Sequence, residues 1–594
     1  MKRQTLLASL LKQLRTHPGF AIAFSVLWLA VVGWIAFGWK LGSVGLIDET
    51  EPLFAEASRQ MYETGDWVTP YFNGETRFDK PPLVYWLMAI AFHLAGVSEW
   101  TVRLPSAIAA TALTALGFYV LRRFGFAQPN QATAITASGG TGLSHQSQNT
   151  LWLSAFIGSA LIALNPETIA WAHIGVSDML LSGCMGAALL AFFMGYAQPE
   201  QPSRQTKWYF SFYVGMALAV LAKGPVGVVL PSLIVIGFLL YVGRLREVLA
   251  ELRLLPGLLL FLLITVPWYV LVILANGRAY IDSFFGYHNL DRFTSVVNGH
   301  SAPWFFYFLV VFVGFVPWSI FLPQAIARLQ FWRVKHWRRQ PRSAQLGLFA
   351  LAWFLGIFIF FTVAVTKLPS YVLPLMPAAA ILVALLWSDR MVAVKPDSVS
   401  WGFGLSVAAN LALMVALAGA ALYSPNWMGD DPSMPNLPDL VQQSGIMLHG
   451  AVIWAVAAVV GLLLVGVRQG RWLWSVNLVA FVAFVGLTMM PALEIADSER
   501  QWPLRQIAAT IVAEQPNEAI VMTGFKKPSL VFYTQRPVNY LYSAAAVEAY
   551  LEQAATPSVL LVGRSAEIAK INPGDRQATQ LLAPEPYELI RLTR

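Results

Sequence analysis

Residues 20–39 read FAIAFSVLWLAVVGWIAFGW, and residues 45–61, just beyond them, read GLIDETEPLFAEASRQM. The first stretch carries no charge and has about the length that an α-helix needs to cross the hydrocarbon core of a bilayer. Directly after it, the second stretch holds four acidic residues: Asp48, Glu49, Glu51 and Glu56. This order predicts a membrane-spanning helix that opens onto a strongly charged segment.

The whole chain has the composition of a protein with many such helices. Of its 594 residues, 57% are hydrophobic and only 12% are charged, which is typical of polytopic helical membrane proteins. The net charge of +8 fits basic cytoplasmic loops, and we predict no nucleic-acid partner. With Cys184 as the one cysteine, the chain forms no intramolecular disulfide and no multi-cysteine metal site.

Thirteen apolar segments are predicted to span the membrane. They lie at 20–39, 104–121, 151–171, 178–196, 208–221, 226–242, 254–274, 304–322, 346–365, 371–387, 401–422, 445–467 and 472–489. With a cytoplasmic N-terminus, every inner loop carries arginine or lysine, from Arg122 and Arg123 to Arg468 and Arg471, as the positive-inside rule requires. An odd number of spans puts the C-terminal tail on the outer face.

The chain divides by composition into a transmembrane part, 1–493, and a tail, 494–594. In the tail, EAIVMTGF, RPVNYLY and PSVLLVG read as strands, and PLRQIAATIVAEQ and SAAAVEAYLEQAA read as amphipathic helices. We expect a small extracytoplasmic α/β domain. It has no nucleotide-binding glycine motif.

The first outer loop, residues 40–103, is too long to be a plain connection. Its segment EPLFAEASRQMYE has the one-sided pattern of an amphipathic helix, and LVYWLMAIAFHLAGV is apolar but short for a span. We expect both to be helices that lie at the membrane surface.

Three lysines break the positive-inside pattern. Lys80, Lys223 and Lys367 each fall at the predicted outer membrane edge, beside proline or glycine. Charges at this depth are candidates for function, and cations there suit the phosphate of a lipid headgroup. For Lys223 an ordinary helix stop at "KGP" is an equal alternative.

Two aspartates at the outer side have structural alternatives as well. Asp48 begins "DETE", which fits a helix N-cap with an acid three residues later, so a capping role and a chemical role both stay open. Asp178 stands at the start of a predicted span, where an acid is costly without a partner or a function. Ser177 could cap that helix in its place.

The outer segments also contain His173, His288, His300 and Arg292. No HxH or HxxxH spacing supports a metal site, and we assign no metal ligand. A phosphate or sugar site with hydrogen bonds from histidine and arginine is the simpler interpretation. No cofactor is certain, and a divalent cation is left open.

The motifs, in their order along the chain, resemble a known family. They are "DE" at 48–49, "GDW" at 65–67, "FDKPP" at 78–82, "SDMLL" at 177–181, "AKGP" at 222–225, "HNLDRF" at 288–293 and "KLPSYVLPLMP" at 367–377. This order resembles the C superfamily of glycosyltransferases that use lipid-linked sugars. The most similar branches are the bacterial aminoarabinose transferases of lipid A and the dolichyl-phosphate-mannose–protein mannosyltransferases.

The resemblance implies an inverting glycosyltransferase whose donor is a polyprenyl-phosphate sugar, undecaprenyl phosphate in bacteria. The catalytic residues that it implies are Asp48, Asp178 and Glu49: Asp48 matches the general base of the family, and Asp178 matches a second acidic position near the same cavity. Lys80 matches the lysine that faces the donor phosphate, although Asp79 stands here where the family has glutamate. Further matches surround the phosphate and the cavity: Arg292, His288, Lys367, Tyr371 and Lys223.

The resemblance leaves the sugar, the oligomeric state and the acceptor open, whether lipid, glycan or protein. It places the chain in a bacterial cytoplasmic membrane, among membrane lipids, with cell-envelope or lipid A modification as its role. A protein O-mannosyltransferase is the nearest alternative. A lipid or sugar transporter is a rival from another class, but the chain shows no clear internal repeat, which many transporters have.

Overall fold

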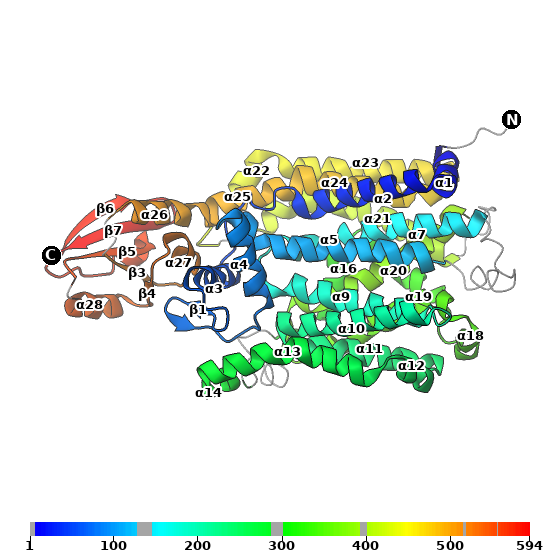
Figure 1. Ribbon diagram of the computed structural model, residues 1–594. Helices are drawn as coiled ribbons and strands as arrows, with labels where there is room; N and C mark the ends of the chain where they lie inside the picture. Colours follow the sequence, from blue (N-terminus) through cyan, green and yellow to red (C-terminus); the bar gives the residue numbers. More distant parts are fainter. Residues whose placement is uncertain are drawn as a thin grey trace.

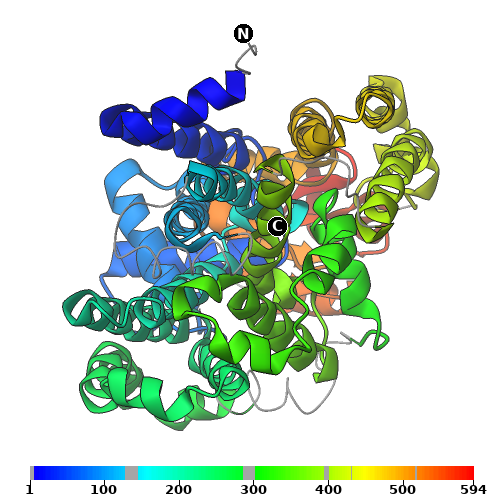
Figure 2. The ribbon, with the colours of Figure 1, turned by 90° about the vertical axis from the view of Figure 1, so that its right-hand side faces the viewer.

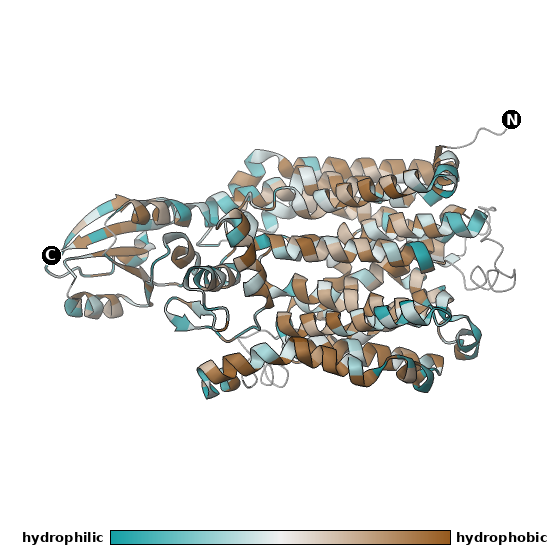
Figure 3. Cartoon of the chain, in the orientation of Figure 1, coloured by the Kyte–Doolittle hydropathy of each residue, from teal (hydrophilic) through white to brown (hydrophobic). Residues whose placement is uncertain are grey.

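The computed structural model describes residues 6–126, 145–284, 286, 301–392, 401–429, 431–514, 518–554 and 556–594. A bundle of long helices carries a small domain with a β-sheet at one end, and helix α1 (Leu6–Thr16) lies at the other end (Figure 1). Figure 2 looks along the bundle from the side of α1. Apolar residues predominate in the bundle, and polar ones are more frequent in the sheet domain (Figure 3).

Nine helical segments of the described chain are long and apolar enough to cross a membrane, or up to eleven if two bent pairs each count as one span. The nine are α2 with η1 (Pro18–Gly38), α5 (Glu99–Phe124), α9 (Ser177–Tyr196), α13 (Leu254–Asn276), α19 (Leu346–Val363), η5 with α20 (Pro369–Val392), α21 with η6 (Trp401–Trp427), α23 (Ile446–Gly466), and η7, α24, η8 and α25 together (Gly470–Arg500). The predicted architecture, a mostly helical chain with many apolar helices, is confirmed.

The count of thirteen spans stays a prediction. All thirteen predicted segments coincide with helices, but α10 (Pro202–Lys223) and α11 (Val226–Val242) do not meet the same criterion of length and apolarity. The two bent pairs are α7 (His145–Ala163) with α8 (Pro166–Ala172), at 58°, and α16 (Phe306–Gly314) with η3 and α17 (Trp318–Ala327), at 112°.

The bend between α7 and α8 follows from Asn165 and Pro166. The Asn165 side chain donates to the carbonyls of Leu161 and Ile162 and accepts the N–H of Thr168, so it caps both helix ends. Pro166 takes the first position of α8, where its missing N–H costs nothing.

Two helices form the centre of the bundle. In α9 and in the η5–α20 segment, 89% and 94% of the most apolar stretch are buried, whereas α13 exposes most of its leucines on the outside. A helix that is apolar all round is expected inside such a bundle. Asp178 lies in the first turn of α9, and Tyr371 lies in η5 at the start of the other central segment.

The first outer loop folds into α3 (Thr50–Thr64), a hairpin of β1 (Tyr71–Phe72) and β2 (Glu75–Thr76), and α4 (Leu83–Ala95). Both predicted helices are confirmed, and their position at a membrane surface stays a prediction. The hairpin was not predicted. Its turn is Asn73–Gly74, with positive φ angles of 55° and 83°, a pair that favours a two-residue hairpin turn.

The C-terminal domain contains a five-stranded sheet in the order β4-β3-β5-β7-β6. The three predicted strands are present as β3 (Ala519–Thr523), β4 (Val538–Leu541) and β5 (Ser558–Arg564), all parallel; β6 (Gln577–Leu582) and β7 (Tyr587–Thr593) add antiparallel strands that were not predicted. Apolar residues of α26 (Trp502–Ala513) and α27 (Ser529–Thr534) pack on one face, and those of α28 (Ala544–Gln553) and α29 (Ser565–Ile568) on the other.

The small α/β domain is thus as predicted, while its start at residue 494 stays a prediction. Helix α25 (Met490–Arg500) continues directly from η8 (Val485–Met489), so the last helical run of the bundle extends past that boundary. The remaining helices are short connections: α12 (Leu245–Glu251), α14 (Arg278–Ile281), α18 (Val334–Arg339), η4 (Arg342–Ala344) and α22 (Leu437–Ser444). The first outer loop lies between the bundle and this domain (Figure 1).

Candidate functional site

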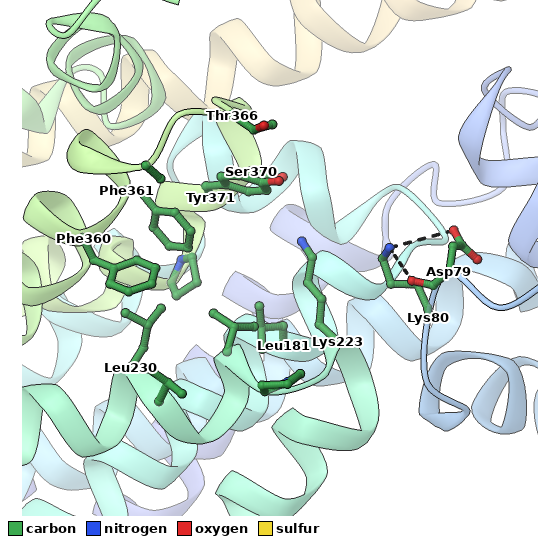
Figure 4. Close-up of a pocket in the computed structure, with 15 residues that line it drawn as sticks. Asp79, Lys80, Leu181, Lys223, Leu230, Phe360, Phe361, Thr366, Ser370 and Tyr371 are labelled. Atoms are coloured by element: carbon green, nitrogen blue, oxygen red, sulfur yellow. Dashed lines mark hydrogen bonds and ion pairs between the residues drawn. The ribbon is translucent and has the colours of Figure 1, made fainter. Parts of the chain in front are cut away.

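A cavity of about 260 Å³ lies where the central helices meet the first outer loop. Most of its wall is apolar, with polar groups concentrated on the side of the loop (Figure 4). The lining residues are Asp79, Lys80, Leu181, Lys223, Pro225, Val226, Val229, Leu230, Phe360, Phe361, Ala364, Thr366, Ser370, Tyr371 and Pro374. Three of the predicted site residues, Lys80, Lys223 and Tyr371, are therefore brought together.

Asp178 and Lys223 form an ion pair beside this cavity. Lys223 Nζ lies 2.6 Å from Asp178 Oδ1, and both side chains are mostly buried. Asp178 also accepts a hydrogen bond from the side chain of Ser370 and lies within electrostatic range of Lys80. The acid at the start of a span has the partner that its position requires.

The local sequence explains how Lys223 reaches this place. It is the last residue of α10, and Gly224 follows with a φ of +99°, a conformation that glycine adopts readily. Lys223 thus ends a helix, as the structural alternative proposed, and also pairs with Asp178. Its Nζ lies 5.4 Å from the centre of the Tyr371 ring, a distance that allows a cation–π contact.

Lys80 is held at the loop side of the cavity by Asp79. Its Nζ donates to the Asp79 carbonyl at 2.8 Å and lies 3.8 Å from the Asp79 carboxylate. That carboxylate also accepts hydrogen bonds from the guanidinium of Arg77 at 2.6 Å and from the hydroxyl of Tyr85 at 3.3 Å. The ammonium group is therefore fixed in orientation, with Pro81 and Pro82 restricting the chain after it.

Lys367 does not line this cavity. Its Nζ donates to the carbonyls of Thr362 and Ala364, at 2.8 and 2.9 Å, and to Phe361 at 3.4 Å. These contacts place the ammonium group on the C-terminal end of α19, where a cation is favourable. Its role at the donor phosphate stays a prediction.

Asp48 does not line the cavity either, and it does not cap α3. The residue at the N-cap is Glu49, which makes no capping hydrogen bond with its side chain, so the N-cap interpretation of Asp48 is wrong. Asp48 is instead 6% exposed and contacts the C-terminal domain: its carboxylate accepts the backbone N–H of Ser529 at 3.0 Å and the Ser529 hydroxyl at 2.5 Å. Burial raises the pKa of Asp48 to about 6 against the lowering effect of those hydrogen bonds.

The neighbouring acids have separate positions. Glu49 is exposed. Glu51 is buried, pairs with Arg103 at 2.9 Å, and accepts the N–H groups of Ile47 and Gly175. The acid three residues after Asp48 thus fastens the start of α3 to the bundle, a role that the sequence did not reveal.

The remaining candidates lie in part outside the described residues. His288, Arg292 and His300 belong to 287–300, which the structure does not describe. His173 is placed, and its ring nitrogens face the carbonyl oxygens of Ile169 and Trp39 at 2.9 and 3.3 Å. Within the described ranges no group of three or more His, Cys, Asp or Glu side chains could hold a metal ion.

Two polar residues near the predicted site were missed. Ser370 belongs to the "KLPSY" motif, so its place beside Tyr371 could have suggested its contact with Asp178. Ser529 is 481 residues from Asp48 in the chain, and no sequence pattern links the two.

Comparisons with known proteins support the resemblance of the motifs. Residues 79–141 match the family model of the dolichyl-phosphate-mannose-protein mannosyltransferases, and residues 513–594 match that of the cyanobacterial RgtA-type glycosyltransferase C-terminal domain. The chain is 29% identical over 412 residues to undecaprenyl phosphate-alpha-4-amino-4-deoxy-L-arabinose arabinosyl transferase 2 of Pseudomonas fluorescens, covering 66% of this chain and 61% of that protein. It is 30% identical over 347 residues to the corresponding transferase of Shewanella sediminis, covering 58% and 56%.

A solved structure shares the fold. The crystal structure of ArnT from Cupriavidus metallidurans bound to undecaprenyl phosphate superposes with a TM-score of 0.75 at 22% identity, over 96% of this chain and 98% of that one. These findings confirm the predicted resemblance to the C-superfamily glycosyltransferases of lipid-linked sugars. Both matching family models and the named relatives also give the predicted enzyme class, glycosyltransferase.

Proposed function

We propose that this protein transfers a sugar from a polyprenyl-phosphate donor to a lipid acceptor at the outer face of a bacterial cytoplasmic membrane. The observation that carries the proposal is the cavity with an apolar wall and with Lys80 and Lys223 at one side. An apolar wall suits a polyprenyl chain, and two fixed cations suit a phosphate. No nucleotide is required, because the lipid itself brings the activated sugar.

The relatives narrow the choice of donor sugar. Two of them are named for undecaprenyl phosphate-linked 4-amino-4-deoxy-L-arabinose, and the ArnT structure was solved with undecaprenyl phosphate bound. We take this donor as the first to test. The aligned regions cover only 61% and 56% of the two relatives, so the sugar is carried over as part of the proposal.

The proposed reaction is an inverting displacement. The acceptor oxygen forms a bond to the anomeric carbon, the bond from that carbon to the phosphate oxygen breaks, and polyprenyl phosphate leaves with the bonding electrons. The acceptor proton passes to the carboxylate of Asp48, the proposed general base. Lys80 and Lys223 stabilise the negative charge that develops on the leaving oxygen. Asp178 keeps Lys223 in place, and Glu49, Lys367 and Tyr371 are assigned to the surroundings of the site.

The proposed orientation has the N-terminus in the cytoplasm and the C-terminal domain outside. Three segments with basic residues, α1, α12 and α18, lie at the end of the bundle opposite the C-terminal domain (Figure 1). This arrangement agrees with the positive-inside rule if that end faces the cytoplasm. The cavity then opens toward the outer leaflet.

The experiment is release of undecaprenyl phosphate by the full-length protein in liposomes. The donor is undecaprenyl-phosphate-linked 4-amino-4-deoxy-L-arabinose, followed by hexose-linked donors, with an extract of bacterial membrane lipids as acceptor. Turnover that is lost in Lys80→Ala and in Asp48→Asn supports the proposal. Donor that crosses the bilayer without release of undecaprenyl phosphate would instead show a transporter.

A protein O-mannosyltransferase is the second candidate, because residues 79–141 match the model of that family. Its acceptor would be a hydroxyl group of a polypeptide. Sugar from labelled donor that appears on protein and not on lipid would favour this alternative.

A further inference from the structure

The first outer loop is joined to the C-terminal domain by a set of hydrogen bonds that the reaction described above does not explain. Tyr533 accepts the backbone N–H of Leu46 at 2.9 Å and donates to Glu99 at 2.9 Å. Asn73 donates to the carbonyl of Val538 and accepts its N–H, at 2.9 and 2.8 Å. Each of these contacts fixes the loop against α27 or β4.

The contact that concerns chemistry is the one between Asp48 and Ser529. Ser529 is fully buried and meets both oxygens of the carboxylate, with its N–H on Oδ1 and its hydroxyl on Oδ2. Gln501, with its amide oriented to suit its neighbours, donates a third hydrogen bond to Oδ2 at 3.2 Å. A carboxylate has about four lone-pair positions, so about one is left for an acceptor hydroxyl.

Charged groups surround this carboxylate from several elements. Lys527, which is 8% exposed, and Arg500 at the end of α25 face it as cations. The hydroxyls of Tyr540 and Tyr587 are also within electrostatic range, and Glu49 acts on Lys527. The cations favour the ionised carboxylate, and burial opposes it.

A second cavity lies beside this group. It has a volume of about 350 Å³ and is lined by Ile47, Arg500 and Gln501, among mostly apolar residues from α8 and α25. Asp48 and Ser529 do not line this cavity themselves. Ile47 adjoins Asp48 in the chain and Gln501 contacts its carboxylate, so the cavity reaches the immediate neighbours of Asp48.

We propose that Ser529 is a positioning residue for Asp48, so that the C-terminal domain completes the active site instead of being an accessory to it. The inference rests on the proposed function, in which Asp48 takes the proton of the acceptor. Ser529 holds the plane of the carboxylate and leaves one lone pair free for the acceptor hydroxyl. Its hydroxyl also favours the ionised form of Asp48, which is the form that a base needs.

The test compares Ser529→Ala with Asn73→Gly in the full-length protein in liposomes. Ser529→Ala removes one hydrogen bond to Asp48. Asn73→Gly removes two hydrogen bonds between the same two parts of the chain, neither of them to Asp48, and glycine tolerates the positive φ of that position. Release of undecaprenyl phosphate is measured from pH 5 to 8, with thermal denaturation of each variant as the check on folding.

We expect the acidic limb of the rate profile to move upward by about one pH unit in Ser529→Ala and to stay in place in Asn73→Gly. Ser529→Thr, which keeps the hydroxyl, should restore the wild-type limb. An unmoved limb in Ser529→Ala, or an equal shift in both variants, would overturn the inference.

A different result would contradict the proposed function. Full turnover in Asp48→Asn would show that Asp48 is not the general base. If no donor is turned over, the effect of Ser529 on the pKa of Asp48 can still be measured from the pH dependence of stability. The stability of wild type is compared with that of Asp48→Asn over the pH range, and the same comparison is made in chains that also carry Ser529→Ala. The pH at which the Asp48 chain gains stability over the Asn chain should be higher with Ser529→Ala, and an unchanged pH would overturn the inference.

Discussion

Lys223 Nζ lies 2.6 Å from Asp178 Oδ1, where α10 ends and the packed helix α9 begins. The pair borders the cavity that also contains Lys80 and Tyr371. A cation that faces a phosphate must not be neutralised or displaced by its own partner. Asp178 keeps Lys223 in position and is itself shared with Ser370, so part of its charge is directed away from the lysine.

We expect Lys223→Ala to reduce both stability and turnover. Loss of the lysine leaves a mostly buried aspartate without its cation, which costs about 3 kcal/mol, and removes a stabilising charge from the leaving phosphate, which lowers turnover about 100-fold. Thermal denaturation in detergent and release of undecaprenyl phosphate measure the two effects.

The matched control for Lys223 is Lys207→Ala. Lys207 is an exposed residue near the other end of the same helix, α10, and its loss should change neither quantity. In the double variant Asp178→Asn with Lys223→Ala, stability should recover in part while turnover stays low. A double variant as unstable as Lys223→Ala would argue against the ion pair.

Lys80 is expected to act on the donor and hardly on the fold. Lys80 Nζ lies 3.8 Å from the Asp79 carboxylate, and Arg77 remains to pair with that aspartate in Lys80→Ala. We expect about a 100-fold loss in kcat/KM for the donor, with a change in Tm of only a few degrees. Lys80→Arg keeps the charge and should lose less. Equal losses in Lys80→Arg and Lys80→Ala would show that geometry, and not charge, is what the site requires.

The helical bundle could be predicted from the sequence because each helix is recognised from a short stretch of residues. Apolar length identifies a span, and the basic loops test the alternation of spans, so most helices were placed to within a few residues. The bends were not predicted, because they depend on single residues such as Asn165 and Pro166. Helices α10 and α11 show the opposite problem: each is a helix as predicted, but their length and polarity leave open whether they cross the membrane.

The site was predicted less completely than the fold. Lys80, Lys223 and Tyr371 line one cavity, as the prediction that their motifs share one membrane edge had suggested. Asp48 was expected with them, yet its carboxylate meets a serine that follows 481 residues later. Contacts between the first and the last part of a chain leave no periodicity or spacing in the sequence, so only the folded structure reveals them.

Two roles of Lys367 can be distinguished by experiment: capping the C-terminal end of α19 and binding the donor phosphate. Its Nζ donates to three carbonyls at the end of α19, and Lys367→Met should therefore lower the free energy of unfolding by about 1–2 kcal/mol. The KM for the donor should change less than twofold, because the ammonium group is engaged with the helix. Donor titrations of wild type and variant decide the matter. A tenfold rise in KM at unchanged Tm would instead support the predicted role at the phosphate.

Asp48 leads to a prediction in which stability and activity depend on pH in opposite directions. Burial raises its pKa from 3.8 to about 6, so the folded protein binds this proton more tightly than the unfolded chain does. The stability contributed by protonated Asp48 is fully present below pH 4 and is lost as the pH rises through 6, by about 3 kcal/mol in all. A general base works only when ionised, so turnover should rise with pH through the same window.

The comparison of wild type with Asp48→Asn isolates this group from the other carboxylates that titrate at low pH. The asparagine cannot ionise, so the stability of wild type relative to the variant should increase as the pH falls from 7 to 4, while the activity of wild type decreases. A stability difference that is constant over this range would mean that Asp48 is already ionised in the folded protein at pH 4. The contact with Ser529 would then outweigh the burial of the carboxylate, and the acidic limb of the rate profile would have to come from another residue.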